Sequence, residues 1–189
     1  MNDLSATFTQ FVMDYIEQST SENKGLITEY DSQWLSPCLQ NLSTGQNNGD
    51  EVNWLPHKRN DSANLNNIAD ALEMDIPQSL SDYFCTYYSL DFNAEHPRGK
   101  IALLQAFNQA DFERLQKNLI AHVLMKRRLK QTETLFFAVT DEDDFIISVE
   151  PNSENVVLEQ VGKPKLEIIS DNLVTFIGEL KPLPQLVML

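Results

Sequence analysis

Three short apolar segments in the C-terminal half follow one another with only turn residues between them, and this spacing constrains the fold more than any other feature. They cover residues 134–140, 144–149 and 156–161, with turn residues at 141–144 and 151–154. Parallel neighbours need a crossover of a dozen or more residues, so segments this close pair as consecutive antiparallel hairpins. The sequence therefore predicts an antiparallel sheet in this half of the chain.

The rest of the chain mixes helical periodicity with two further apolar segments. Apolar residues recur at helical spacing over 5–18, 65–73 and 109–130, in a segment that begins near 77, and in a last one that begins near 170. Strands are predicted over 51–56 and 101–107, and a loop over 91–99. We expect Ser5 to cap the first helix, and Asn108 to cap the longest one, with Asp111 completing a variant of the capping box.

These elements predict an α+β fold, in which a mixed but mostly antiparallel sheet is packed by helices. With 189 residues, the chain is expected to form a single domain over 1–189 and to act as a monomer. Two alternatives stay open for the apolar tail 184–189, which either docks on the core or stays loose.

The chain is expected to be made and kept in the cytoplasm. Its first residues show neither a basic region nor an apolar one of the secretory type, and the longest uncharged apolar run, 135–139, falls far short of the roughly 20 residues of a membrane-spanning helix. Two cysteines, Cys38 and Cys85, form no disulfide framework and no CxxC motif. We expect both to be reduced and at least partly buried.

Negative charge is concentrated in the first half of the chain. Residues 1–95 carry 15 Asp and Glu but only three Lys and Arg, a net charge of −12, whereas residues 96–189 carry 13 and 11, a net charge of −2. Such a field attracts basic partners and repels nucleic acid and anionic lipid. The asymmetry favours a basic protein partner, although acidity also serves solubility, and composition alone leaves both explanations open.

No pattern of catalytic or metal-binding residues stands out. His57 and His96 are isolated in the sequence and expected at the surface, whereas His122 is expected to be a partly buried structural residue. The acidic turn 141–144 lacks the ligand spacing of an EF-hand. Nucleotide-binding glycine motifs are absent. The basic residues of 126–130 lie at a predicted helix C-terminus, where cations complement the helix dipole. We therefore predict no enzyme, no metal, no cofactor and no nucleic-acid binding.

An acidic face is the remaining candidate site. Carboxylates near aromatic residues could clamp a basic peptide through charge pairs and cation–π contacts. The alternative is that the aromatic residues belong to the core and the carboxylates are merely solvated. The candidate partner-binding residues are Asp70, Glu73, Asp75, Asp82, Asp91, Glu95 and Trp54, with Trp34, Tyr83 and Tyr88 nearby in sequence.

The chain also resembles a known family over nearly its whole length. The matching blocks, in order, are 36–38, 54–56, 103–122, 126–130, 135–138, 147–149, 172–173 and 180–183, and the densest part is 100–149. These blocks are similar to those of Syd, the family of SecY-interacting proteins. The loops 43–50 and 91–99 look most divergent.

The resemblance implies a domain similar to the SMI1/KNR4 superfamily without enzymatic activity. It implies a cytoplasmic protein held peripherally at the cytoplasmic side of the inner membrane through SecY, the channel subunit of the Sec translocase. The expected contact is between an acidic concave surface and basic cytosolic loops of SecY, and the expected role is a proofreader or negative regulator of improperly complexed SecY. The alternative within the superfamily is an immunity-type or scaffold protein for another basic partner.

Overall fold

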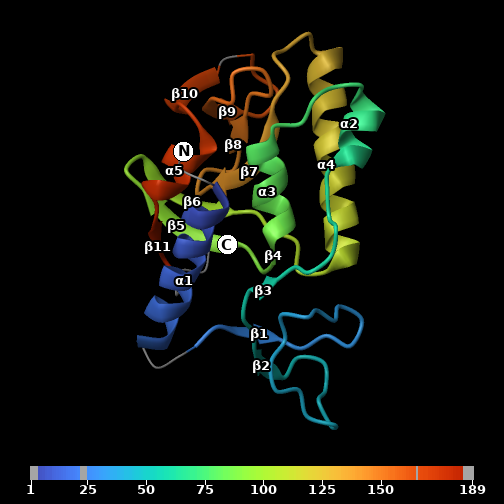
Figure 1. Cartoon of the computed structure of the whole chain (residues 1–189), viewed down its shortest axis with the longest axis vertical. Coiled ribbons are helices and arrows are strands. Elements are labelled where there is room, and N and C mark those ends of the chain that lie inside the picture. Colours follow the sequence, from blue (N-terminus) through green and yellow to red (C-terminus); the bar gives the residue numbers. More distant parts are fainter. Residues whose placement is uncertain (1–3, 22–24, 165, 185–189) are drawn as a thin grey trace.

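A seven-stranded antiparallel sheet lies at the centre of the structure, a computed structural model that describes residues 4–21, 25–164 and 166–184 (Figure 1). Its order is β10-β9-β8-β7-β6-β5-β11. The strands are Phe92–His96 (β5), Gly99–Leu103 (β6), Leu135–Thr140 (β7), Phe145–Val149 (β8), Val156–Gln160 (β9), Leu166–Ser170 (β10) and Lys181–Pro182 (β11). The consecutive hairpins from β7 to β9 confirm the prediction from segment spacing, and with it the α+β fold class.

Helices are found in each segment where helical periodicity predicted one. They are Leu4–Ser21 (α1), Asn66–Leu72 (α2), Gln78–Thr86 (α3), Gln109–Arg128 (α4) and Leu173–Gly178 (α5). Helices α1, α3 and α5 contact one another, α4 runs along β7, and α2 lies against α4 (Figure 1). The predicted tail falls mostly on residues 185–189, which lie outside the described residues.

Aromatic rings join these helices to the sheet. The ring of Phe8 in α1 lies 4.9 Å from that of Tyr83 in α3, and the ring of Phe137 in β7 lies 5.5 Å from that of Phe176 in α5 (centroid distances). All four side chains are fully buried. Because burying one such ring stabilises a fold by about 1.5–3 kcal/mol, this cluster holds the helical layer on the sheet.

The segment predicted as the loop 91–99 is a strand followed by a tight turn. Phe92, Ala94 and His96 are buried, while the residues between them are more exposed, which is the alternation of a strand with one face in the core. His96 stacks on Phe176 with 4.8 Å between ring centroids, so its predicted surface position was wrong. Gly99 closes the turn with a φ of 144°, a conformation that favours glycine.

Of the two predicted helix caps, one is confirmed and one is wrong, and the last helix begins slightly later than predicted. The side chain of Asn108 accepts a hydrogen bond from the backbone N–H of Asp111 at 3.0 Å and so caps α4. Ser5 lies inside α1, which already includes Leu4, and is not its cap. The last helix begins at Leu173 and is capped by Asn172, because β10 takes up the chain as far as Ser170.

Lys126 lies with Arg127 and Arg128 in the last turn of α4, where the sequence predicted a basic helix C-terminus, but unlike them it is buried. Its side chain is only 2% exposed, and its ammonium forms an ion pair with the equally buried carboxylate of Glu159 in β9. It also donates to the hydroxyl of Thr134 at 2.8 Å. His122 completes the group, with its Nε2 3.1 Å from the same hydroxyl and 3.6 Å from Glu159, as expected for a partly buried structural residue. These contacts fasten the C-terminal part of α4 to the sheet.

Two small sheets flank the large one. Ile27–Glu29 (β1) pairs with Glu51–Asn53 (β2), which confirms the first half of the predicted strand 51–56, and His57–Lys58 (β3) pairs with Tyr87–Tyr88 (β4). The β1–β2 sheet and its loops lie beside the N-terminal end of α4 (Figure 1). This small sheet therefore places residues 27–53, which come from the acidic half of the chain, next to the main body.

Both edges of the seven-stranded sheet are short or irregular. The edge strand β11 has two residues, and one of them, Pro182, has no backbone N–H. The opposite edge strand, β10, has a shift in register between Ile168 and Ser170. Such features interrupt the regular row of hydrogen-bonding groups along an edge.

Candidate partner-binding surface

Three of the predicted carboxylates lie together at the C-terminal end of α2. Asp70 is in the helix, Glu73 is its C-cap residue and Asp75 follows, and all three are exposed. Glu73 adopts the left-handed conformation (φ 49°, ψ 49°), which reverses the chain after the helix. The backbone thus presents this small acidic group to solvent.

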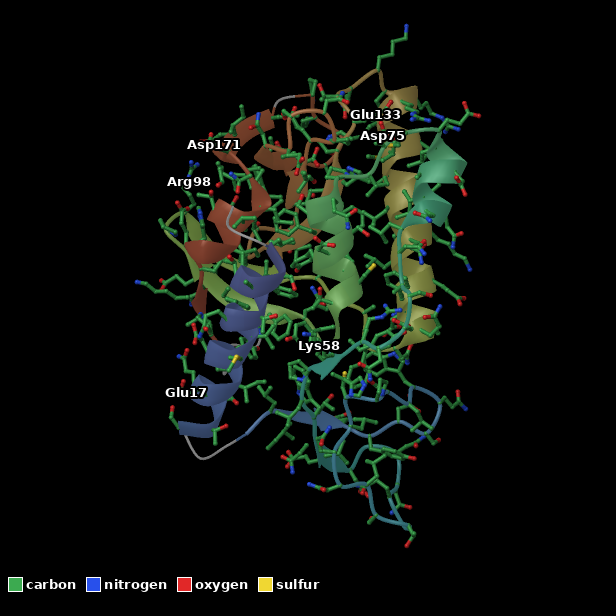
Figure 2. All side chains as sticks on the ribbon, in the orientation of Figure 1. Glu17, Lys58, Asp75, Arg98, Glu133 and Asp171 are labelled. Carbon is green, nitrogen blue, oxygen red and sulfur yellow. The ribbon has the colours of Figure 1, made fainter. Side chains whose placement is uncertain are left out.

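The C-terminal end of α4 places a cation beside this group. Arg127 donates two hydrogen bonds to Glu133, at 2.9 and 3.0 Å. Glu133 raises the pKa of the Arg127 guanidinium above its ordinary value, and the charge of Glu73 acts in the same direction. Asp75 and Glu133 lie toward the same end of the molecule (Figure 2). The negative charge at the end of α2 is therefore partly balanced within the chain.

The other predicted residues are dispersed. Asp82 in α3 is half-buried and accepts a hydrogen bond from Gln78 at 2.7 Å. Glu95 is exposed on β5, where its neighbours across the sheet are Lys100 and Lys181. Trp54 is only 4% exposed and packs in the core. The structure does not gather the seven predicted residues into one surface.

Asp91 lies in a concavity that we call the acidic cavity. This depression has a volume of about 280 Å³ and lies between α4, the segment before β5 and the loop that carries Trp34. Its lining includes two carboxylates, three aromatic rings and one cation: Asp91, Asp111, Trp34, Phe107, Phe136 and Arg114. It combines the two properties expected of the site, concavity and negative charge beside aromatic residues.

Asp91 is an exposed residue that lines this cavity. It accepts a hydrogen bond from the backbone N–H of Gln105 at 2.8 Å. Burial raises the pKa of Asp91 to about 6 and Asp111 acts in the same direction, while the Gln105 hydrogen bond opposes them. At neutral pH the cavity therefore holds a carboxylate in surroundings that disfavour its charge.

Asp111 shapes the opposite wall of the acidic cavity. It is 8% exposed, accepts a hydrogen bond from the indole N–H of Trp34 at 2.9 Å, and pairs with Arg114 at 2.6 Å. Among the described residues no hydrogen bond joins this carboxylate to the Asn108 backbone N–H, so only the Asn108 half of the predicted capping box forms. Sequence reasoning missed this role, because Trp34 and Asp111 are 77 residues apart and no local pattern connects them.

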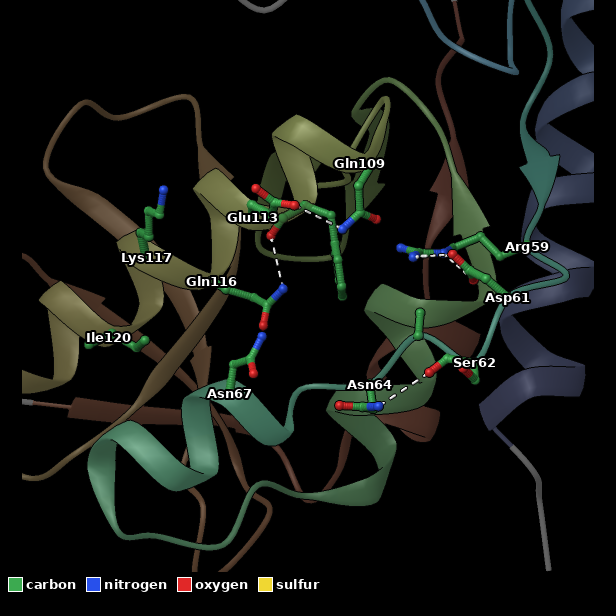
Figure 3. A pocket seen from close by; sticks show the side chains of 12 residues that line it. Arg59, Asp61, Ser62, Asn64, Asn67, Gln109, Glu113, Gln116, Lys117 and Ile120 are labelled. Atoms are coloured by element: carbon green, nitrogen blue, oxygen red, sulfur yellow. Dashed lines mark hydrogen bonds and ion pairs between the residues drawn. The ribbon is translucent and has the colours of Figure 1, made fainter.

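A larger polar cavity of about 640 Å³ lies between α4, α2 and the loop that precedes α2 (Figure 3). Three of its four charged side chains, those of Arg59, Asp61 and Glu113, have partners within the chain. Arg59 pairs with Asp61 at 2.7 Å, and Glu113 accepts a hydrogen bond from Gln109 at 3.2 Å. None of the seven predicted residues lines this cavity, so it does not serve as the expected acidic site.

Groups suited to redox or metal chemistry are not assembled in the described part of the chain. Cys38 is buried and Cys85 is half-buried, and both are free, as predicted. Burial raises the pKa of both thiols, which keeps them protonated and unreactive at neutral pH. Among the described residues, no group of three or more His, Cys, Asp or Glu side chains could hold a metal ion.

Within the described ranges, no helix combines the length and the apolar character needed to cross a bilayer.

Comparison with known proteins gives consistent matches over almost the whole chain. The family model described as Syd protein (SUKH-2) matches residues 5–182. Protein Syd of Alteromonas mediterranea is 43% identical over 180 residues, which cover 95% of this chain and 97% of that protein. Protein Syd of Pseudoalteromonas atlantica is 40% identical over 182 residues, which cover 96% and 94%. Protein Syd of Colwellia psychrerythraea is 39% identical over 190 residues, which cover 95% of each.

Proposed function

The chain belongs to the Syd family, and we propose that it is a non-enzymatic protein that binds SecY, the channel subunit of the Sec translocase. In this proposal it recognises basic cytosolic loops of SecY through an acidic concave surface and acts as a proofreader or negative regulator of improperly complexed SecY. It acts as a cytoplasmic monomer, binds no nucleic acid, and reaches the cytoplasmic side of the inner membrane only through SecY.

Family membership and electrostatics support this proposal. The observation that carries it is Asp91, an exposed residue in a concave, aromatic-lined depression, within a half-chain of net charge −12. A field of this sign speeds the encounter with a basic surface and sets its orientation. The same field repels the phosphates of nucleic acid.

The test measures whether the immobilised chain captures purified SecY, either alone or as the intact SecYEG complex. Capture is compared at about 0.05 M and about 0.5 M salt, because the screening of charges becomes much stronger over this range. We expect capture at low salt, weaker capture at high salt, and preference for SecY without its partners. An empty resin at both salt concentrations would contradict the proposal. In that case an immunity-type or scaffold role for another basic partner, such as a toxin encoded beside this gene, becomes the better candidate.

A further inference from the structure

Asp91 is a carboxylate without a cation. Among the ion pairs of the described residues, none includes Asp91, whereas its neighbour Asp111 pairs with Arg114. Its hydrogen bond comes from a neutral backbone N–H, that of Gln105. A carboxylate held among rings in a depression gains most from a cation that arrives from outside, because that cation would replace the water lost on burial.

Two further side chains in the wall of the acidic cavity, Ser89 and Gln105, have buried polar atoms without a hydrogen-bond partner in the described structure. Ser89 lines the cavity and is 0% exposed, yet its hydroxyl makes no hydrogen bond within the described structure. Buried hydroxyls are normally hydrogen-bonded, so the wall of the cavity carries unsatisfied polar atoms, although at 0% exposure the Ser89 hydroxyl itself is not accessible to a ligand. The volume of about 280 Å³ lies just below the roughly 300–1,000 Å³ of small-molecule pockets. This size suits one long side chain better than a metabolite.

The chain holds one of its own guanidinium groups with the same kinds of partner. The guanidinium carbon of Arg59 lies 4.1 Å from the ring centroid of Tyr88 and 4.4 Å from that of Phe112. Two of its nitrogens bind the carboxylate of Asp61, at 3.0 and 2.7 Å. A carboxylate with flanking rings is thus an arrangement that this protein already uses to hold an arginine.

We propose that the acidic cavity is a receptor for one arginine side chain of the protein partner. Its guanidinium pairs with Asp91 and stacks against the rings that Trp34 and Phe136 contribute. Arginine fits better than lysine, because a planar fork can bind a carboxylate through two hydrogen bonds and lie on an aromatic face at the same time. The inference rests on the proposed function only in that the partner is a basic protein.

The pairing makes binding sensitive to pH. The titratable and charged groups around Asp91 are Asp111 and Arg114 from α4, Tyr15 from α1 and Tyr83 from α3. Burial raises the pKa of Tyr15 to about 12 and that of Tyr83 well above its ordinary value, so neither titrates near neutrality. Protonation of Asp91, with its pKa of about 6, therefore weakens arginine binding about fourfold between pH 7.5 and pH 5.5.

The experiment titrates the chain with acetyl-Gly-Arg-Gly-amide and follows the two indole N–H signals by NMR. The sequence has two tryptophans, and Trp54, buried in the core, serves as an internal control for Trp34 in the cavity. Parallel titrations use the lysine peptide and the uncharged citrulline peptide. Asp91→Asn keeps an acceptor for the Gln105 N–H but removes the charge. Glu113→Gln removes a carboxylate from the other cavity and is the matched control.

We expect the Trp34 signal to shift and saturate with the arginine peptide, with the Trp54 signal unchanged. The lysine peptide should bind more weakly, and the citrulline peptide should give no saturating shift. Asp91→Asn should weaken binding of the arginine peptide about tenfold, whereas Glu113→Gln should leave that binding unchanged. Equal shifts with citrulline, or full arginine binding by Asp91→Asn, would overturn the inference. The titration contains no SecY, so its result is independent of the capture experiment. Arginine binding without capture of SecY would contradict SecY as the partner. Capture of SecY without arginine binding would contradict the acidic cavity as the arginine receptor.

Discussion

Replacing Glu159 with glutamine should destabilise the chain strongly, because it removes the charge that compensates a buried lysine. Glu159 and Lys126 are each only 2% exposed in their side chains. The amide keeps the shape of the carboxylate and can still accept hydrogen bonds from Ser148 and Thr134. It leaves the Lys126 ammonium without an anion in the interior, between α4 and the sheet.

The size of the effect follows from two independent considerations. Removing one member of a buried ion pair costs about 3–5 kcal/mol. Burial alone would raise the pKa of Glu159, but hydrogen bonds from His122, Lys126, Ser148 and Thr134 outweigh it and lower the pKa from 4.5 to about 2. By linkage, a depression of this size corresponds to about 3 kcal/mol. Because the folded-state pKa is the lower one, this stability is present above about pH 4.5 and is lost as the pH falls toward 2.

The assay is urea unfolding followed by circular dichroism, at neutral pH and at decreasing pH. Glu159→Gln should lose about 3 kcal/mol at pH 7, and its deficit relative to the parent chain should shrink as the pH falls below 4.5. Lys126→Met combined with Glu159→Leu should recover much of the loss, since apolar groups need no counter-charge. Glu167→Gln, which removes the exposed partner of Arg98, should cause no measurable change. Full stability of Glu159→Gln, or a double variant no better than the single one, would refute this reasoning.

Three further predictions concern the core, a helix end and the acidic surface. Phe8→Ala removes a fully buried ring from the cluster around Tyr83 and should cost about 3–5 kcal/mol in urea unfolding. Asn108→Ala leaves the first turn of α4 uncapped and should cost about 1 kcal/mol by the same assay, whereas an unchanged midpoint would show that the cap is dispensable. Glu73→Lys with Asp75→Lys should slow association with SecY at low salt and leave thermal stability nearly unchanged; unaltered affinity would remove the end of α2 from the binding surface.

Elements with a strong local pattern could be predicted from the sequence, and elements held by distant contacts could not. The hairpins from β7 to β9 follow from their spacing, and α4 from its long apolar stripe and Asn108 cap. β5 was missed because only Phe92 and Ala94 carry an apolar pattern, while its third buried residue is His96. β11 contains two residues and a proline, and only pairing with β5 makes it a strand.

The sequence indicates which kinds of side chain the candidate site contains, but not which particular residues come together in it. Acidity and aromatic residues are visible in the sequence, and Asp91 was among the residues chosen. The indole of Trp54 is buried, and the neighbours of Asp91 could not be predicted because Asp111 and Trp34 come from distant segments. Lys126 shows the same limit: within a basic run nothing distinguishes the one lysine whose partner, Glu159, lies on a strand 33 residues away.

The irregular edges of the large sheet decide which forms of recognition this fold can support. A peptide that joins a sheet as an extra strand needs a row of free backbone N–H and C=O groups, and the two-residue β11 with Pro182 offers almost none. The shifted register between Ile168 and Ser170 interrupts the opposite edge in the same way. These edges therefore disfavour the addition of a strand to the large sheet, whether from a peptide or from a second copy of the chain, and favour recognition through side chains.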